Sequence, residues 1–282
     1  MRKMMPVPLP VNNLILVIVC TGLSMVCYSQ SFRSPQTAIY SGLGALSKSF
    51  RDVFSFAENP AGLNELQGIS AGIYAERRFM LAELNQYVAA AHYGLVNSGI
   101  GIQMHYAGSG AYNESMAGLS YGRNLGKISL GLQFNYHKIS ISGYGSDGTY
   151  SADIAVIWQL THKLRAGIQV INPVPVFFGP GKSEQYSSMY KLGMGFEFSG
   201  KCFLAGEINK ETEKTVNVIL AIQYGFSGKM YLKAGVNTDI GKPFAGVGWT
   251  LADFRLDVTG SYHPGLGFTP GMMVIFKNRK RK

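Results

Sequence analysis

The sequence contains little cysteine and lacks the long apolar runs of helical membrane proteins. Of its three cysteines, Cys20 and Cys27 lie in a segment that we expect to be removed, which leaves only Cys202. A single cysteine cannot form an internal disulfide, so packing and hydrogen bonding must stabilise the mature chain. After residue 29 no apolar run reaches the length of about 18 residues that a helical membrane span requires. The sequence therefore excludes membrane-spanning helices.

Motifs for metal, cofactor and catalytic chemistry are also missing. The five histidines show no metal-ligand spacing, and neither Cys-x-x-Cys nor His-Glu-x-x-His occurs. The paired glycines in 42–45 and 143–146 lack the strand-to-helix context of a phosphate-binding loop. The predicted strand ends bring together no Ser, His and Asp arrangement. We therefore expect no enzyme activity, no catalytic residue, no metal and no cofactor.

The first 29 residues have the pattern of a secretory signal peptide. Arg2 and Lys3 precede an apolar or small run over 14–26, and small residues follow near Ser29. The thirteen residues of this run are too few for a membrane anchor, which needs about 20. We expect cleavage near Ser29 and export of the remaining chain.

The exported chain keeps a basic excess that is partly concentrated at its end. Without Arg2 and Lys3 it has 24 basic and 16 acidic residues, a formal charge of +8. Lys277 and the four basic residues of 279–282 form a basic tail. Basic clusters can bind nucleic acid or anionic surfaces, but an exported chain does not meet nucleic acid. We interpret 278–282 as a solvated periplasmic tail.

Residues 127–137 separate completely into an apolar face and a polar face. One face carries Ile128, Leu130, Leu132, Phe134 and Tyr136, and the other carries Ser129, Gly131, Gln133, Asn135 and His137. A period of two predicts a β-strand. Thirteen further segments follow comparable patterns, which gives fourteen candidate strands, an even number typical of a closed antiparallel membrane barrel. The candidates lie near 68–76, 84–94, 98–106, 113–122, 126–137, 149–160, 163–171, 187–198, 201–209, 214–225, 229–237, 243–250, 252–262 and 266–277.

The connections between these candidates alternate between short and longer ones, as expected for periplasmic turns and external loops. The longer ones include 77–83, 139–147 and 172–186. A mean hydropathy of +0.08 does not oppose a membrane location, because alternating strands average their two faces. The sequence thus predicts an all-β transmembrane antiparallel barrel over 67–277. We expect it to contact lipids of the outer membrane of a Gram-negative bacterium.

Charged side chains consistently avoid the apolar faces and are predicted to line the lumen. They could line a substrate path, or they could pair with each other and with a segment that fills the barrel. The predicted lumen-lining residues are Glu76, Arg165, Lys191, Glu197, Glu207, Lys233, Arg255 and Asp257.

Residues 30–66 do not alternate and are predicted to plug the barrel. A short helix is expected over 50–58, followed by a capped turn, because the residue before proline avoids the helical region and glycine adds freedom. A small apolar segment with an Asp, followed by this turn and then strands, resembles the FadL-like outer-membrane barrels, including PorV and PorQ type proteins of the type IX secretion system. The resemblance implies a fourteen-stranded barrel with an N-terminal hatch inside it. The turn consists of Asn59, Pro60, Ala61, Gly62 and Leu63.

The predicted loop over 172–181 is unusually apolar. Prolines stiffen it, and an exposed loop should be polar. It could bind a hydrophobic ligand, bind a protein partner or fold over the barrel mouth. Its apolar residues are Val174, Val176, Phe177 and Phe178.

Function is expected mainly from the resemblance, because barrel architecture does not identify cargo. The resemblance to PorV and PorQ implies a partner-binding component of protein secretion or cell-surface attachment. The alternative is a FadL-like passive channel for hydrophobic small molecules; the short loops here differ from the long apolar loops of the fatty-acid branch. An outer-membrane enzyme and a purely structural barrel are further alternatives.

Overall fold

The computed structural model describes residues 44–174, 176–178, 184–212, 214–238 and 242–278. All of them belong to Ser31–Lys282, the second of the two units into which the chain divides. The expected signal peptide, the first part of the expected plug and the end of the basic tail lie outside the described residues. Among the described residues, no helix is long and apolar enough to cross a membrane.

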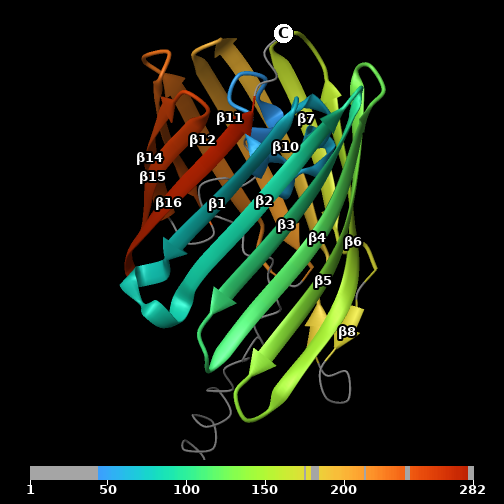
Figure 1. Cartoon of the computed structure of the whole chain (residues 1–282), viewed down its shortest axis with the longest axis vertical. Helices are drawn as coiled ribbons and strands as arrows, with labels where there is room; N and C mark the ends of the chain where they lie inside the picture. Colours follow the sequence, from blue (N-terminus) through green and yellow to red (C-terminus); the bar gives the residue numbers. More distant parts are fainter. Residues whose placement is uncertain (1–43, 175, 179–183, 213, 239–241, 279–282) are drawn as a thin grey trace, which may run out of the picture. The chain divides into compact units, whose positions relative to one another are not determined.

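Fourteen antiparallel strands close into one barrel (Figure 1). Each strand pairs with its neighbours along the chain, except that β7 pairs with β10, and β16 returns to pair with β1. Closure pairs the backbone groups of every barrel strand within the sheet, which a hydrocarbon environment requires. The predicted fold is therefore confirmed. The barrel strands are β1 (Ile69–Arg77), β2 (Asn85–Leu95), β3 (Ser98–Gly108), β4 (Tyr112–Asn124), β5 (Ile128–Ile141), β6 (Gly145–Gln159), β7 (Leu164–Ile171), β10 (Met189–Ser199), β11 (Cys202–Glu211), β12 (Asn217–Gly225), β13 (Met230–Asn237), β14 (Lys242–Leu251), β15 (Phe254–His263) and β16 (Gly267–Asn278).

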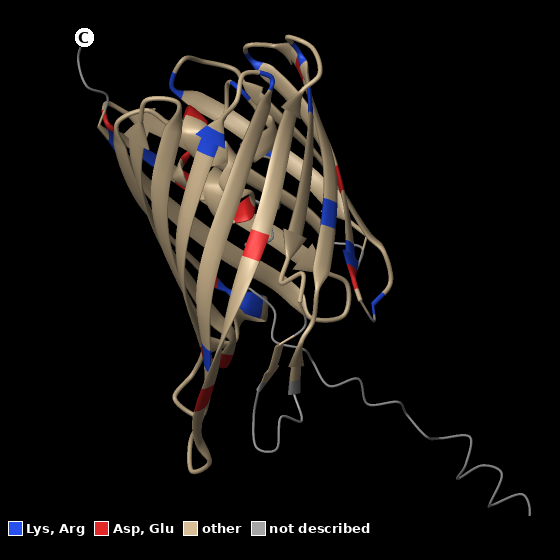
Figure 2. Cartoon of the chain, turned by 90° about the vertical axis from the view of Figure 1, so that its right-hand side faces the viewer, with Lys and Arg blue, Asp and Glu red and all other residues tan. Residues whose placement is uncertain are grey.

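Strand β5 shows which face of the sheet is outside. Leu132 and Phe134 are 46% and 64% exposed, whereas Gln133 and Asn135 are both 3% exposed. The apolar face of the strand therefore points outward and the polar face points into the barrel. Most of the strand ribbon is uncharged (Figure 2). This arrangement is that of an outer-membrane barrel with lipid around it, as the sequence predicted.

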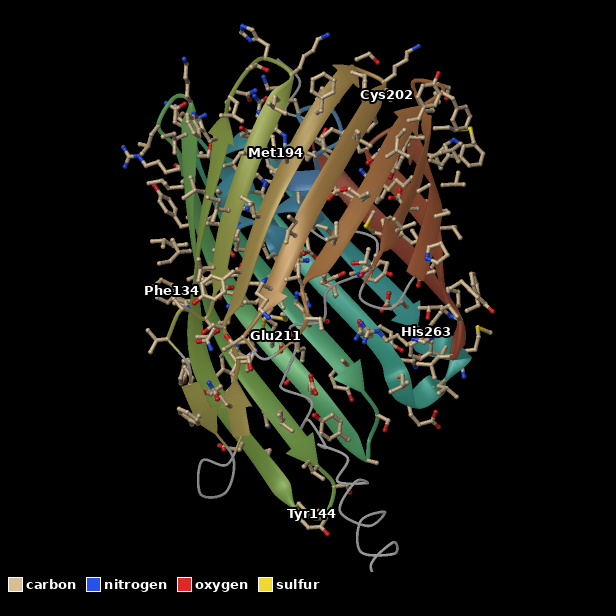
Figure 3. The ribbon with its side chains drawn as sticks, turned by 180° about the vertical axis from the view of Figure 1, so that it is seen from behind. Phe134, Tyr144, Met194, Cys202, Glu211 and His263 are labelled. Carbon is tan, nitrogen blue, oxygen red and sulfur yellow. The ribbon has the colours of Figure 1, made fainter. Side chains whose placement is uncertain are left out.

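Turns and loops lie at opposite ends of the barrel, but one predicted loop is wrong. Residues 139–147 were expected to form a long connection, whereas β5 continues to Ile141 and β6 begins at Gly145. Gly143 and Gly145 have φ values of 80° and 96°, which suits a tight turn better than a long loop. The two strands thus extend as a hairpin with Tyr144 at its tip (Figure 3).

Two other connections at this end contain short elements. Between β1 and β2 the chain forms the 3-10 helices η3 (Arg78–Met80) and η4 (Ala82–Leu84). Between β7 and β10, β8 (Val176–Phe178) and β9 (Glu184–Tyr186) form a separate two-stranded sheet.

Three short helices fill the barrel at its short-turn end (Figure 1). They are η1 (Gly44–Leu46), α2 (Val53–Glu58) and η2 (Pro60–Glu65), and together with the residues between them they are called the plug below. Helix α2 lies within the predicted helical segment. It begins after Asp52, whose side chain accepts a hydrogen bond from the Phe54 backbone, and Ser55 completes a capping box.

The apolar core of the molecule lies between the plug and the inner wall. Val53, Phe56 and Leu63 are completely buried, and they pack in one cluster with wall residues such as Phe203 and Ile219. Burying these side chains stabilises the plug in its position inside the barrel, because each one removes apolar surface from water.

Candidate functional site

The plug is held to the barrel wall by a buried cluster around Arg255. On β15, Arg255 Nη2 donates to Asp52 Oδ2 at 2.6 Å and to Asp257 Oδ2 at 2.9 Å. Asp257 also accepts hydrogen bonds from Tyr231 and, at 3.5 Å, from Lys233. Because Asp52 is the N-cap of α2, one guanidinium group joins the start of the plug helix to the wall.

A second contact joins Glu197 on β10 to the residues between η1 and α2. Its carboxylate accepts hydrogen bonds from the Ser47 and Ser49 hydroxyls, both at 2.7 Å. It also accepts the backbone N–H groups of Lys48 at 2.6 Å and Ser49 at 3.0 Å. Hydrogen bonds to an ionised carboxylate are stronger than neutral ones, so Glu197 fixes the conformation of this segment.

A third contact involves the end of η2. Arg165 Nη1 on β7 lies 2.8 Å from Glu65 Oε2, and Arg51 of the plug pairs with the same carboxylate. Partial burial and then the charges of Arg165 and Arg51 lower the pKa of Lys48, whereas Glu197 raises it. Glu65 pairs with Arg165 on the wall and with Arg51 in the plug, so it balances both of these positive charges.

The fourth contact is the buried pair of Lys191 and Glu58. Lys191 Nζ on β10 lies 3.3 Å from Glu58 Oε2 at the end of α2, and the two side chains are 5% and 8% exposed. The plug is thus tied to strands β7, β10 and β15 through side chains with no covalent link. These contacts hold the plug in place against the inner wall.

The two remaining predicted lumen residues, Glu76 and Glu207, are also buried on the barrel wall. Glu76 accepts a hydrogen bond from the Tyr74 hydroxyl at 2.6 Å and pairs with Arg78 at 3.0 Å. Glu207 is 4% exposed on β11, opposite Gly193. A role in lining a substrate path remains a prediction for all eight residues.

The predicted Asn-Pro turn lies directly against the wall. The side chain of Asn59 accepts a hydrogen bond from Ala61 N at 3.1 Å, and Pro60 begins η2. A Cβ atom at Gly131 would collide with the backbone of Ala61. Glycine at this position of β5 therefore allows the plug to approach the sheet.

The apolar loop forms a small hairpin at the long-loop end. Val174 and Phe177 are 72% and 52% exposed, and Val176 is half-buried opposite Tyr186 in the β8–β9 pair. The side chain of Phe178 is outside what the structure describes. A binding role for the loop remains a prediction.

Sequence reasoning did not single out a polar ladder on the inner wall. Ser120 Oγ donates to Gln133 Oε1 at 2.8 Å, Gln133 Nε2 donates to Asn135 Oδ1 at 2.7 Å, and Asn135 Nδ2 donates to Asp153 Oδ2 at 2.9 Å. All four side chains are buried. These four residues occupy the polar faces of neighbouring strands, and that pattern was the sequence signal that could have predicted the ladder.

The acidic plug residues were also missed as partners of the wall. Asp52, Glu58 and Glu65 are isolated acids in a segment that is otherwise mostly small and apolar. Buried acids need a cation or several donors, so each was a sign of a basic partner on the barrel.

Comparisons with known proteins support the fold. No protein-family model matches the chain, and no curated protein matches it. Among solved structures, the chain resembles the CymD monoaromatic hydrocarbon channel at a TM-score of 0.62 and 10% identity, over 86% of this chain and 99% of that one. It resembles the Pseudomonas putida toluene transporter TodX at 0.61 and 10% identity, over 84% and 96%. A Pseudomonas aeruginosa FadL homologue matches at 0.55 and 10% identity, over 84% and 96%.

These similarities show that the chain shares the barrel fold of these proteins, and they correct the expected function. The resemblance to PorV and PorQ had implied a partner-binding role in protein secretion. That prediction is wrong, because the similar structures are described as channels and transporters of hydrocarbons. They favour the alternative, a channel for hydrophobic small molecules. The short loops had spoken against the fatty-acid branch, but loop length at the barrel mouth varies independently of the barrel and plug.

Proposed function

We propose that this chain is a passive outer-membrane channel for small apolar molecules, closed at its short-turn end by the plug. The observation that carries the proposal is the plug itself, within a barrel fold shared with hydrocarbon channels. A fixed, purely structural barrel does not need a separate segment tied to its wall by charged side chains. A gated channel does, because the segment must close the lumen and still be able to move.

The external mouth supports apolar cargo. Tyr144 and Tyr150 on the β5–β6 hairpin are 90% and 75% exposed, and Val174 and Phe177 are exposed on the neighbouring loop. Such side chains offer an apolar surface at the end of the barrel where external loops lie. We propose monoaromatic hydrocarbons as the first cargo class to test.

We infer export through a signal peptide over 1–29, a plug that begins after it and a periplasmic basic tail. We also infer a role without catalysis, because the similar structures are channels and transporters.

Uptake by cells tests the proposal. The full chain is expressed in a Gram-negative host that lacks its own channel for apolar compounds, and initial uptake of radiolabelled toluene and sucrose is measured. Toluene uptake should rise several-fold over a host with an empty vector, while sucrose uptake should not change. Heat-modifiable migration on gels verifies that the barrel is folded. Unchanged toluene uptake, or an equal rise in sucrose uptake, would contradict an apolar channel.

A further inference from the structure

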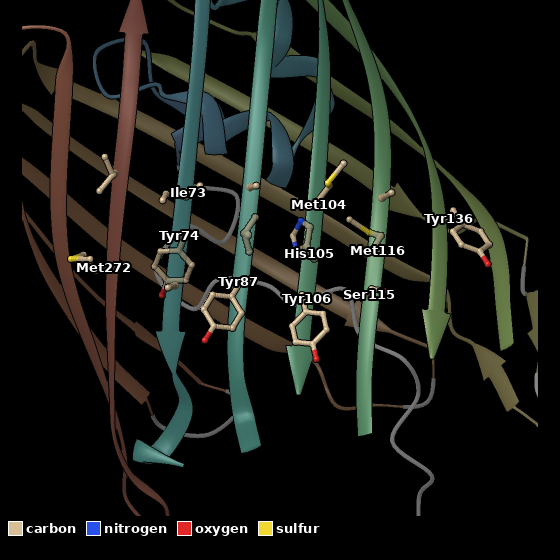
Figure 4. A pocket seen from close by; sticks show the side chains of 15 residues that line it. Ile73, Tyr74, Tyr87, Met104, His105, Tyr106, Ser115, Met116, Tyr136 and Met272 are labelled. Carbon is tan, nitrogen blue, oxygen red and sulfur yellow. The ribbon is translucent and has the colours of Figure 1, made fainter. Parts of the chain in front are cut away.

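The outer wall of the barrel is hollowed by an apolar groove over β16 and β1 to β5 (Figure 4). A cavity of about 530 Å³ lies there, and a second of about 370 Å³ shares four lining residues with it, Ile73, Ala89, Met104 and Val274. The groove is on the surface that faces lipid, so its natural occupants are molecules of the membrane.

The groove exists because small side chains alternate with large ones on the outward face. Alanines form its floor, while Ile73, Met104 and the tyrosines of β2, β3 and β5 rise around it. The floor residues are Ala71, Ala75, Ala89, Ala91 and Ala117.

The long-loop end of the groove is polar and cationic. The hydroxyl groups of Tyr87, Tyr106 and Tyr136 all point toward this end (Figure 4). Arg77 ends the outward-facing row of β1, and Lys138 lies two residues beyond Tyr136 on β5; both are exposed. The outward-facing positions of β1 to β5, all of which are described, include no acidic residue. The rim is therefore suited to an anionic group, and the groove below it to acyl chains.

The separation of the two cations at the rim favours one kind of membrane lipid. Arg77 and Lys138 are on strands four spacings apart, which at about 4.8 Å per strand gives about 19 Å. Two phosphates carried on one extended headgroup, with several acyl chains side by side, match this spacing better than one phosphate with two chains. Long loops face outward in outer-membrane barrels, and phosphorylated glycolipids form the leaflet on that side.

We propose that this groove binds a bis-phosphorylated, multiply acylated glycolipid of the lipid A class. Its acyl chains lie over the alanine floor, and its phosphates bind Arg77 and Lys138. Arginine and lysine bind phosphate strongly, and the tyrosine hydroxyls add donors at the same level. The proposal concerns the lipid partner of the barrel and does not depend on what the channel carries.

Native mass spectrometry of the full chain in detergent tests this site. The probes are bis-phosphorylated lipid A, monophosphoryl lipid A and phosphatidylglycerol. Lipid A should form a one-to-one adduct at lower concentration than the other two. The double variant Arg77→Gln with Lys138→Gln should weaken this adduct about tenfold or more, because two charge-assisted contacts are lost.

Two further variants distinguish lipid binding in the groove from nonspecific electrostatic attraction to the barrel. Lys210→Gln removes an exposed cation at the same end of the barrel on β11, away from the groove, and should leave the adduct unchanged. Ala89→Leu with Ala91→Leu fills the groove floor, keeps both cations and should also weaken the adduct. The substitutions face outward, so heat-modifiable migration should be retained. Equal adducts for lipid A and phosphatidylglycerol would overturn the proposal, as would an equal loss in Lys210→Gln.

Discussion

Replacing Arg255 by glutamine should loosen the plug without unfolding the barrel. The change keeps much of the side-chain length but removes the positive charge between Asp52 of the plug and Asp257 of the wall. The Arg255 and Asp52 side chains are 14% and 4% exposed, so water screens their interaction little. Asp52 would then keep a buried negative charge with no cation from β15.

The magnitude follows from the surroundings of the two carboxylates. Breaking a buried ion pair by removing one partner costs about 3–5 kcal/mol. Tyr231 and Lys233 still contact Asp257 in the variant, so the lower end applies. At about 1.4 kcal/mol per factor of ten, a cost of about 3 kcal/mol raises the population with a released plug about a hundredfold.

Hydrogen exchange in detergent measures this directly, because local opening exposes backbone amides. Peptides covering α2 should exchange about a hundredfold faster in Arg255→Gln, while peptides of β5 should not change. Arg78→Gln is the matched control, because it breaks the 3.0 Å pair with Glu76, which lies outside the plug. A change in α2 of less than about threefold, well below the expected effect, would refute the view that Arg255 holds the plug. Equally faster exchange in β5 would show general destabilisation instead.

Two other changes test the plug seat and the membrane face. Gly131→Ala should displace the Asn-Pro turn and raise toluene uptake, because a Cβ atom there collides with the plug backbone. Gly200→Ala is the control and should leave uptake unchanged, because a Cβ atom there meets no atom within 4 Å. Equal uptake by both variants would contradict the close approach of the plug to Gly131. Leu132→Lys should lower the folding free energy of the barrel in bilayers by about 2–4 kcal/mol, because it places a charge in lipid. Tyr144→Lys on the exposed hairpin tip should change it by less than about 0.5 kcal/mol, and similar losses for both would show that Leu132 does not face lipid.

The strands were predictable because alternation is a local property. In β5 the sequence alone showed which side chains share a face, and the strand count favoured closure. The expected loop over 139–147 was wrong. Strand β5 continues to Ile141 and β6 begins at Gly145, and the tight turn between them uses the positive φ of Gly143 and Gly145.

The function was harder to predict, because the leading interpretation depended on loop length and on a short motif. The Asn-Pro turn caps η2 and approaches the wall at Gly131, so its residues have a structural role within the plug. A motif with a structural task cannot identify cargo.

The sequence alone predicted an apolar face and a polar face for each strand, because a period of two separates them. The even number of candidate strands favoured closure. The sequence also indicated which charges point inward. Only the tertiary structure decided which of them meet: Arg255 and Asp52 are 203 residues apart, and their contact depends on where closure of the whole barrel places β15 relative to the plug. The groove on the outer wall has the same origin, because its floor consists of alanines on separate strands that only their register brings side by side.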